Sequence, residues 1–186
     1  EFKDIAFSGN GEPTASKQFK EVIGILIKKI NQYKLKTKIV IRLITNGSYM
    51  TKLGVQEALS LISNFDHEVW FKIDRVHEED IKITNQVNLT SSAVKKNLEA
   101  SLRNNPTVIQ TCLFKINNKL PSSESIDAYI DFLKLYDEKI KEIHLYSLAR
   151  PSKQPNEIEL SRLSESELKS IEKKMKVLST PTKIFS

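Results

Sequence analysis

The sequence is poor in cysteine, glycine and proline, and it has no long hydrophobic run. The single cysteine, Cys112, excludes an internal disulfide, which fits the reducing cytoplasm. Five glycines and six prolines among 186 residues exclude collagen-like and low-complexity chains. No apolar run approaches the roughly 20 residues that cross a bilayer, so we expect no membrane partner. The first residues show neither the charged nor the apolar region of a signal peptide.

The composition is that of a globular protein with a basic surface. Hydrophobic residues make up 39% of the chain and charged residues 28%, and this length predicts one domain over residues 1–186. The net charge of +6 would attract nucleic acid or another acidic partner. However, the lysines are spread along the chain, without an arginine-rich block or an aromatic ladder. We therefore favour solvated helix faces over nucleic-acid binding.

Strand-like and helical patterns alternate along the chain. Short apolar or β-branched runs predict strands at residues 4–8, 38–44, 68–74, 107–115, 142–147 and 182–185. Helical spacing of apolar residues predicts helices at residues 19–30, 53–65, 91–102, 126–135 and 164–178. Ser164 and Glu167 form a capping-box pattern at the start of the last helix. The alternation indicates an α/β fold with a parallel sheet, either open or closed into a barrel.

The segment after the first predicted strand is the strongest candidate for a site. Ligands of parallel α/β folds bind beyond the carboxyl ends of the strands. Gly9 and Gly11 allow the backbone to approach a ligand closely. Glu12 adds a carboxylate that can hold an ammonium group, and Pro13 fixes φ just before the helix. A tight strand-to-helix turn is the alternative interpretation.

The next two strands also end in polar residues. Thr45 and Asn46 follow the second strand, although Asn-Gly is a turn dipeptide wherever it occurs. On the third strand Trp70, Lys72 and Asp74 share one face. A lysine and an aspartate on a buried strand need a partner, either each other or a ligand.

The fourth and fifth strands add further candidates. Gln110, Cys112 and Phe114 share a face of the fourth strand, and His144 and Tyr146 share a face of the fifth. We expect Cys112 to be a small buried core residue.

Several of these strand ends resemble those of one enzyme family. The run FSGNGEPT at residues 7–14 is similar to the "GGEP" motif that radical S-adenosylmethionine (radical SAM) enzymes carry after their second strand. The run LITNGS at residues 43–48 resembles the end of the family's third strand. Residues 72–74, 108–111 and 145–151 resemble the ends of the fourth, fifth and sixth. The similarity covers nearly the whole chain, and the first motif is the most specific.

The resemblance implies a partial (β/α) barrel of about five to six parallel strands that lacks the first strand of the family. It also implies that the first motif contacts the amino group of the methionine moiety of S-adenosylmethionine. The residues implied to bind the cofactor are Gly9, Asn10, Gly11, Glu12, Pro13, Thr45, Asn46, Lys72, Asp74, Gln110 and Tyr146.

The family holds a four-iron, four-sulfur cluster with a Cys-x-x-x-Cys-x-x-Cys segment, which this sequence lacks. Cys112 alone cannot replace three thiolates. The resemblance therefore implies a fragment of a longer enzyme. We expect the chain itself to hold no cluster and to have no turnover, and we assign it no metal ligand and no catalytic residue.

Two functions follow. In the first, the parent enzyme reductively cleaves S-adenosylmethionine to a 5′-deoxyadenosyl radical, which abstracts hydrogen from an unknown substrate. This is iron–sulfur, oxidoreductase-like chemistry carried by the cofactor. In the alternative, a non-catalytic, cluster-less barrel binds a ligand or a partner at the same edge. A phosphate-binding barrel is less favoured, because Glu12 stands where a phosphate would need donors.

Two further expectations concern the beginning of the chain. The missing strand would leave the edge at residues 4–8 unpaired, and an unpaired edge promotes self-association. Glu12 should matter for cofactor binding and little for folding, because it stands in a turn at the rim of the sheet.

Overall fold

A computed structural model describes residues 3–9, 11–36, 38–77, 79–81, 90–149 and 159–185. The chain divides into two compact units. The first comprises residues 1–72 and 92–108, and the second comprises residues 73–91 and 109–186.

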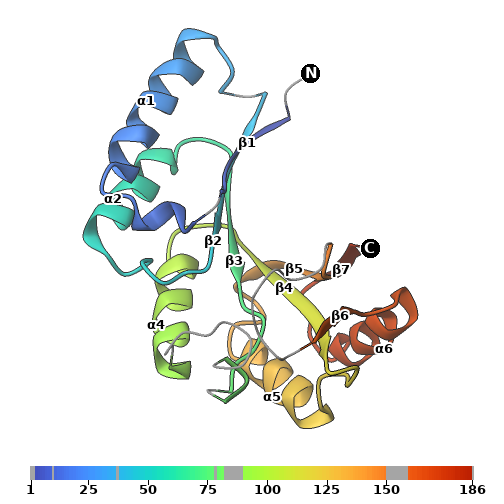
Figure 1. Ribbon diagram of the computed structural model, residues 1–186. Coiled ribbons are helices and arrows are strands. Elements are labelled where there is room, and N and C mark those ends of the chain that lie inside the picture. The colour runs from blue at the N-terminus through green and yellow to red at the C-terminus, as the bar shows by residue number, and fades with distance from the viewer. Residues whose placement is uncertain are drawn as a thin grey trace. The chain divides into compact units, whose positions relative to one another are not determined.

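The first unit contains three neighbouring strands and the helices connected to them. Its strands are β1 (Asp4–Phe7), β2 (Val40–Thr45) and β3 (His67–Lys72), which pair in parallel in this order. Its helical segments are the short 3-10 helix η1 (Pro13–Ala15), α1 (Phe19–Gln32), α2 (Leu53–Ile62) and most of α4 (Ser91–Leu102). Helices α1 and α2 lie on the same side of these strands (Figure 1).

Strands β2 and β3 of the first unit have one buried face and one partly exposed face. Ile41 and Leu43 of β2 and Val69 and Phe71 of β3 are buried, as are the apolar side chains of α1 and α2 that form the core. The alternate residues lie on the opposite face, where Arg42, Glu68 and Trp70 stand beside the aliphatic Val40 and Ile44. The first unit therefore carries charged side chains on one sheet face as well as a core.

An ion-pair network crosses that partly exposed face. Arg42 Nε donates to Glu68 Oε2 at 2.9 Å, and an Arg42 Nη1 donates to Asp4. The indole Nε1 of Trp70 donates to the same Glu68 oxygen at 2.9 Å. The arginine on this face thus has two carboxylate partners.

The second unit contains the remaining strands. They are β4 (Thr107–Ile116), which begins in the first unit, β5 (Ile140–Ser147), β6 (Leu160–Arg162) and β7 (Thr182–Phe185). The order is β4-β5-β7, with β7 parallel to β5 and β6 antiparallel to β4. Its helices are α5 (Ser123–Lys134) and α6 (Glu165–Met175).

The element pattern predicted from the sequence is confirmed. All six predicted strands and five predicted helices are present, with ends that differ by a few residues. The capping box is also present, because Ser164 Oγ accepts from Glu167 N and Glu167 Oε2 accepts from Ser164 N at 2.8 Å. Strand β6 is the addition that the periodicity did not predict.

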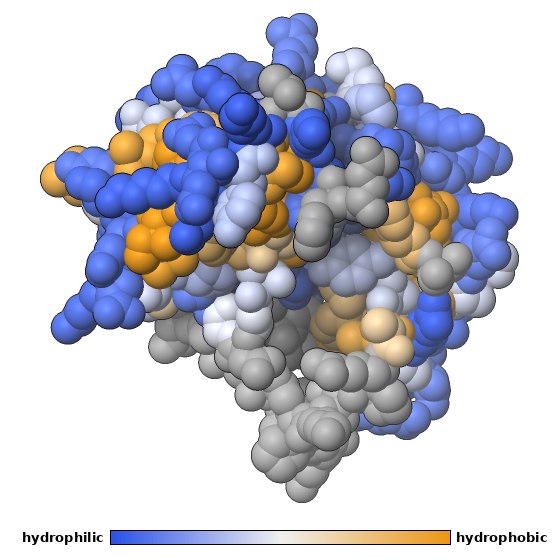
Figure 2. Space-filling view, turned by 90° about the horizontal axis from the view of Figure 1, so that it is seen from above, coloured by the Kyte–Doolittle hydropathy of each residue, from blue (hydrophilic) through white to orange (hydrophobic). Residues whose placement is uncertain are grey.

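Two observations describe the helices and the surface of the protein. Within the ranges that the structure describes, no helix combines the length and the apolar character needed to cross a bilayer. Hydrophilic side chains cover much of the face shown in Figure 2. Lysines such as Lys28 and Lys173 are exposed on their helices, as expected of solvated helix faces.

Candidate functional site

The predicted glycine-containing turn follows β1 and precedes α1. Glu12 is the N-cap residue of η1, and its Oε1 accepts hydrogen bonds from the backbone N, at 3.1 Å, and the hydroxyl of Thr14. Pro13 is the first residue of η1, where its missing N–H costs no helical hydrogen bond. The prediction that this run forms the turn between the first strand and the first helix is confirmed.

The same carboxylate also reaches the end of β2. Glu12 Oε1 accepts from the Thr45 hydroxyl at 2.6 Å, and Oε2 accepts from the backbone N of Asn46 at 2.7 Å. Oε1 thus serves three donors and Oε2 one. Each carboxylate oxygen offers about two lone-pair positions, so Oε2, with one donor, retains capacity for one more.

These bonds revise the expectation that Glu12 contributes little to folding. Its partners Thr14 and Thr45 are buried, and Glu12 itself is only partly exposed. Hydrogen bonds to a charged group are stronger than neutral ones. Glu12 is therefore a structural link between two strand ends as well as a candidate site residue.

The turn after β2 fixes the backbone that meets Glu12. Thr45 Oγ1 accepts from the backbone N of Gly47, and Asn46 Oδ1 accepts from the backbone N of Ser48, both at 2.9 Å. Gly47 has φ of +77°, and a Cβ at this position would lie 2.1 Å from Cζ of Phe71. Asn-Gly is thus a genuine turn here, and that turn presents the Asn46 amide to Glu12.

Open space borders the glycine loop. Gly9 and Gly11 are exposed, and a Cβ built on either would meet no atom within 4 Å. A ligand can therefore approach the backbone at these two positions. Asn10, predicted to belong to the same site, lies outside the described residues.

The other predicted site residues are distributed over both units. Lys72 is the exposed last residue of β3 in the first unit, whereas Asp74, Gln110 and Tyr146 belong to the second. The backbone carbonyl of Gln110 accepts from Ile73 N at 3.0 Å.

Asp74 has a partner that the sequence did not suggest. It is buried, and its Oδ1 accepts from the backbone N of Cys112 at 2.8 Å. Burial, together with the negative charge of Asp74 and the proximity of Cys112, raises the pKa of the half-buried Tyr146 phenol. Asp74, Cys112 and Tyr146 are thus neighbours within the second unit.

The sequence analysis did not identify two residues of these clusters. Thr14 supplies two of the four donors to Glu12. Its position two residues after a glutamate that caps a helix was the signal that could have identified it. Arg75 is buried and directly follows Asp74 in the chain. The available signal was its position, because a charged residue directly after a buried strand is unusual.

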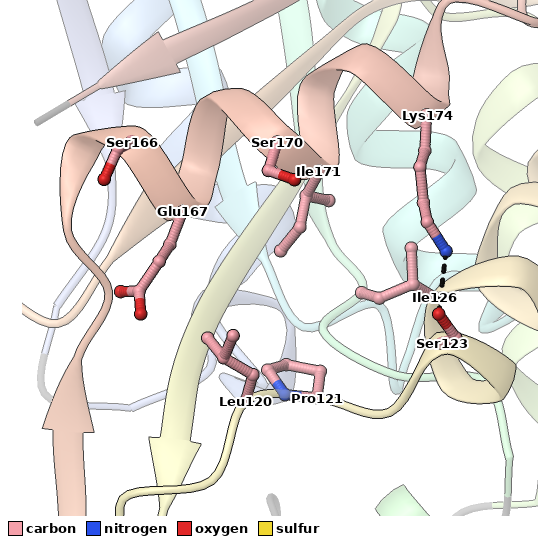
Figure 3. A pocket seen from close by; sticks show the side chains of 9 residues that line it. All are labelled: Leu120, Pro121, Ser123, Ile126, Ser166, Glu167, Ser170, Ile171 and Lys174. Carbon is pink, nitrogen blue, oxygen red and sulfur yellow. Dashed lines mark hydrogen bonds between the residues drawn. The ribbon is translucent and has the colours of Figure 1, made fainter.

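A surface pocket of about 300 Å³ lies in the second unit, and its lining shares no residue with these clusters (Figure 3). It is lined by Leu120, Pro121, Ser123, Ile126, Ser166, Glu167, Ser170, Ile171 and Lys174. Lys174 Nζ donates to Ser123 and Asp127 at 3.0 Å, and Glu167 pairs with Lys115 at 2.9 Å. The charged groups of this pocket therefore already have protein partners.

No metal site is evident in the described part of the chain. Within it, no group of three or more His, Cys, Asp or Glu side chains is placed to hold a metal ion. The absence of a cluster from this chain stays a prediction.

Comparisons with known proteins identify the fold. No protein-family model matches the sequence, and no curated protein matches it. A crystal structure of a domain of pyruvate-formate lyase-activating enzyme from Bacteroides vulgatus matches 99% of this chain and 99% of its own, with a TM-score of 0.68 and 14% identity. A radical SAM methyltransferase from Sphaerobacter thermophilus matches 98% of this chain at a TM-score of 0.62 and 11% identity.

The chain spans half the length of that methyltransferase and nearly all of the activating-enzyme domain. At these identities the likeness concerns the fold. It confirms the prediction of an α/β fold of the partial radical SAM barrel type.

Proposed function

We propose that this chain is the S-adenosylmethionine-binding part of a radical SAM enzyme. The observation that carries the proposal is the Glu12 carboxylate, which joins the ends of β1 and β2 beside two open glycines. The fold similarity and the sequence run at residues 7–14 support it.

The residues present fit the methionine end of the cofactor. An ammonium group has three N–H donors and needs acceptors around it. Oε2 of Glu12 retains acceptor capacity, and the exposed backbone at Gly9 and Gly11 can add carbonyl oxygens. The bonds from Thr45 and Asn46 hold the carboxylate in place, so it requires little reorganisation when a ligand arrives.

The residues present do not fit an iron–sulfur cluster. Such clusters need several thiolates, and the sequence offers only Cys112, which is buried. No chemical step through a cluster is therefore assigned to this chain. In the complete enzyme S-adenosylmethionine would supply the hydrogen-abstracting chemistry, while Glu12, the glycine loop and Asn46 would bind and orient it.

Calorimetric titration of the chain with S-adenosylmethionine tests the proposal. We expect saturable binding that is weakened when the amino group of the ligand is acetylated, because acetylation removes the ammonium charge. Equal affinity for the two compounds, or no binding, would contradict the assignment of the ammonium to this loop.

A cluster-less binding barrel is the second candidate, favoured by the presence of a single cysteine. It would use the same loop, so binding alone does not separate the two. The native reading frame upstream of Glu1 separates the two candidate functions, together with iron and sulfide analysis of its full-length product. Three cysteines at the family spacing would favour the enzyme, and their absence would favour the binding barrel.

A further inference from the structure

Arg75 is a buried arginine at the carboxyl end of β3. Only 5% of its surface is exposed. Its Nη1 donates to the backbone carbonyl of Asp74 at 2.6 Å, and its guanidinium carbon lies 5.5 Å from the ring centroid of Phe114. One carbonyl and one aromatic face use only part of a guanidinium that carries five N–H donors.

Arg75 has no ion-pair partner within the ranges that the structure describes. The nearby acidic side chains bond to other groups: Asp74 Oδ1 to the Cys112 amide and Asp80 Oδ2 to the Ser125 hydroxyl. Burial lowers the pKa of Arg75 by more than the negative charges of Asp74 and Asp80 raise it. The positive charge is thus incompletely compensated.

Arg42 of the first unit shows the ordinary alternative. Its side chain is 21% exposed, so it is less deeply buried than Arg75, and it pairs with both Asp4 and Glu68. Buried charges in proteins are usually paired, because an unpaired one loses its hydration without compensation. An arginine buried at the ligand-binding edge of a parallel strand, with no carboxylate in ion-pair contact among the described residues, is an exception that requires a cause.

We infer that Arg75 is the anion-binding residue of a ligand site in the second unit, and that its ligand carries a carboxylate or a phosphate. The planar fork of N–H donors matches both groups in a bidentate manner. Phe114 supports the guanidinium from one face, and the bond to the Asp74 carbonyl fixes its direction. The inference does not depend on S-adenosylmethionine binding at the Glu12 loop.

Arg75→Met and Arg75→Lys in the full chain test the inference, with Arg42→Met as the matched control. Inorganic phosphate is the probe, compared with sodium chloride at equal ionic strength. We expect phosphate to bind the wild-type chain in calorimetry and to raise its melting temperature. Arg75→Met should weaken phosphate binding about tenfold to a hundredfold, as expected for lost charge-assisted hydrogen bonds.

The stability of the unliganded variants separates a binding role from a structural one. Arg75→Met should melt at or above the wild-type temperature, because it removes a poorly compensated buried charge. Arg42→Met should melt lower and should bind phosphate normally. Arg75→Lys keeps the charge but loses the fork, so it should fold and should bind phosphate more weakly than the wild type.

Two results would overturn the inference. One is phosphate binding that is unchanged in both Arg75 variants, or absent from the wild type. The other is a loss of stability in Arg75→Met that equals that of Arg42→Met, without an effect on phosphate affinity.

Titration with S-adenosylmethionine distinguishes the source of the anion. If Arg75→Met binds it about tenfold more weakly, the anion is the carboxylate of the cofactor. If its affinity is unchanged while phosphate binding is lost, the anion belongs to the substrate. Failure of the Glu12 loop to bind S-adenosylmethionine would contradict the proposed function and leave this inference standing.

Discussion

The backbone amide of Asn46 donates a hydrogen bond to Glu12 Oε2 at 2.7 Å, although the two residues are 34 positions apart in the chain. The bond fastens the turn after β2 to the turn after β1, at the carboxyl ends of neighbouring parallel strands. Glu12, which resembles a cofactor ligand in the sequence, thus also joins two turns of the fold.

Replacing Glu12 by glutamine should destabilise the unliganded protein. The amide NH₂ would face donors where a carboxylate now accepts four hydrogen bonds. We expect a loss of about 2 kcal/mol in the free energy of unfolding, typical of hydrogen bonds to charged groups. For a chain of this length that corresponds to a fall of about 4–8 °C in melting temperature.

Glu57→Gln provides the control for Glu12→Gln. Glu57 forms an exposed ion pair with Lys20 at 2.8 Å, and such pairs contribute less than about 1 kcal/mol. Equal melting temperatures for the two variants would show that the Glu12 bonds do not stabilise the fold.

Gly47→Ala should be more damaging than its size suggests. The positive φ strains any L-residue, and the new methyl group would collide with the ring of the buried Phe71. We expect a loss of about 2 kcal/mol or more in urea unfolding. Gly54→Ala is the matched control, because a Cβ there meets no atom within 4 Å and alanine favours the helix. A Gly47→Ala variant as stable as Gly54→Ala would contradict the description of this turn.

Glu142 should make stability depend on pH at the acid end. Burial alone would raise its pKa, but hydrogen bonds and positive charge from Lys183 and His144 outweigh burial and lower it. The stabilisation is therefore complete above the ordinary glutamate value of 4.5 and is lost as the pH falls through the lower folded pKa.

Urea unfolding of the wild type and of Glu142→Gln at several pH values measures this effect. The difference in the free energy of unfolding should be present above the ordinary glutamate value of 4.5 and should shrink toward zero in acid. Glu138→Gln, at an exposed position of the same unit, should show no such dependence. A difference that grows as the pH falls would reverse the assigned sign.

Strand β1 should promote self-association. It is the first strand in the sheet order, and among the described residues its neighbouring strand is β2. The carbonyl of Lys3 accepts from Val40, so the alternate residues Asp4 and Ala6 direct their backbone groups away from β2. We predict concentration-dependent dimers in light scattering, and fewer of them for Ala6→Pro, which removes an outward N–H. A strict monomer at high concentration would contradict this prediction.

The sequence predicted the elements of the fold well because their signals are local. Alternation along β2 and the capping box at Ser164 depend only on near neighbours in the chain. Strand β6 was missed because its three residues carry no periodicity. It exists through its pairing with β4 at Ile116, a tertiary interaction that local patterns do not encode.

The candidate site was predicted in part for the same reason. The sequence analysis recognised the run that contains the glycines, Glu12 and Pro13, and it also recognised the polar residues at the end of β2. The convergence of Thr14, Thr45 and Asn46 on one carboxylate depends on strand register, which the sequence does not give. The partner of Asp74 was missed because it is a backbone amide, that of Cys112, and not a side chain.

The most direct test of cofactor binding uses glycines that are not needed for folding. A Cβ on Gly9 or Gly11 meets no atom within 4 Å, so Gly9→Ala and Gly11→Ala should fold like the wild type. Gly24→Ala is the control, because a Cβ at Gly24 is equally unobstructed but this residue belongs to helix α1 and not to the loop. Calorimetry should show S-adenosylmethionine affinity reduced about tenfold or more in the two loop variants and unchanged in Gly24→Ala, with all melting temperatures at or above that of the wild type. Wild-type affinity in both loop variants would contradict the claim that the cofactor approaches the backbone of this turn.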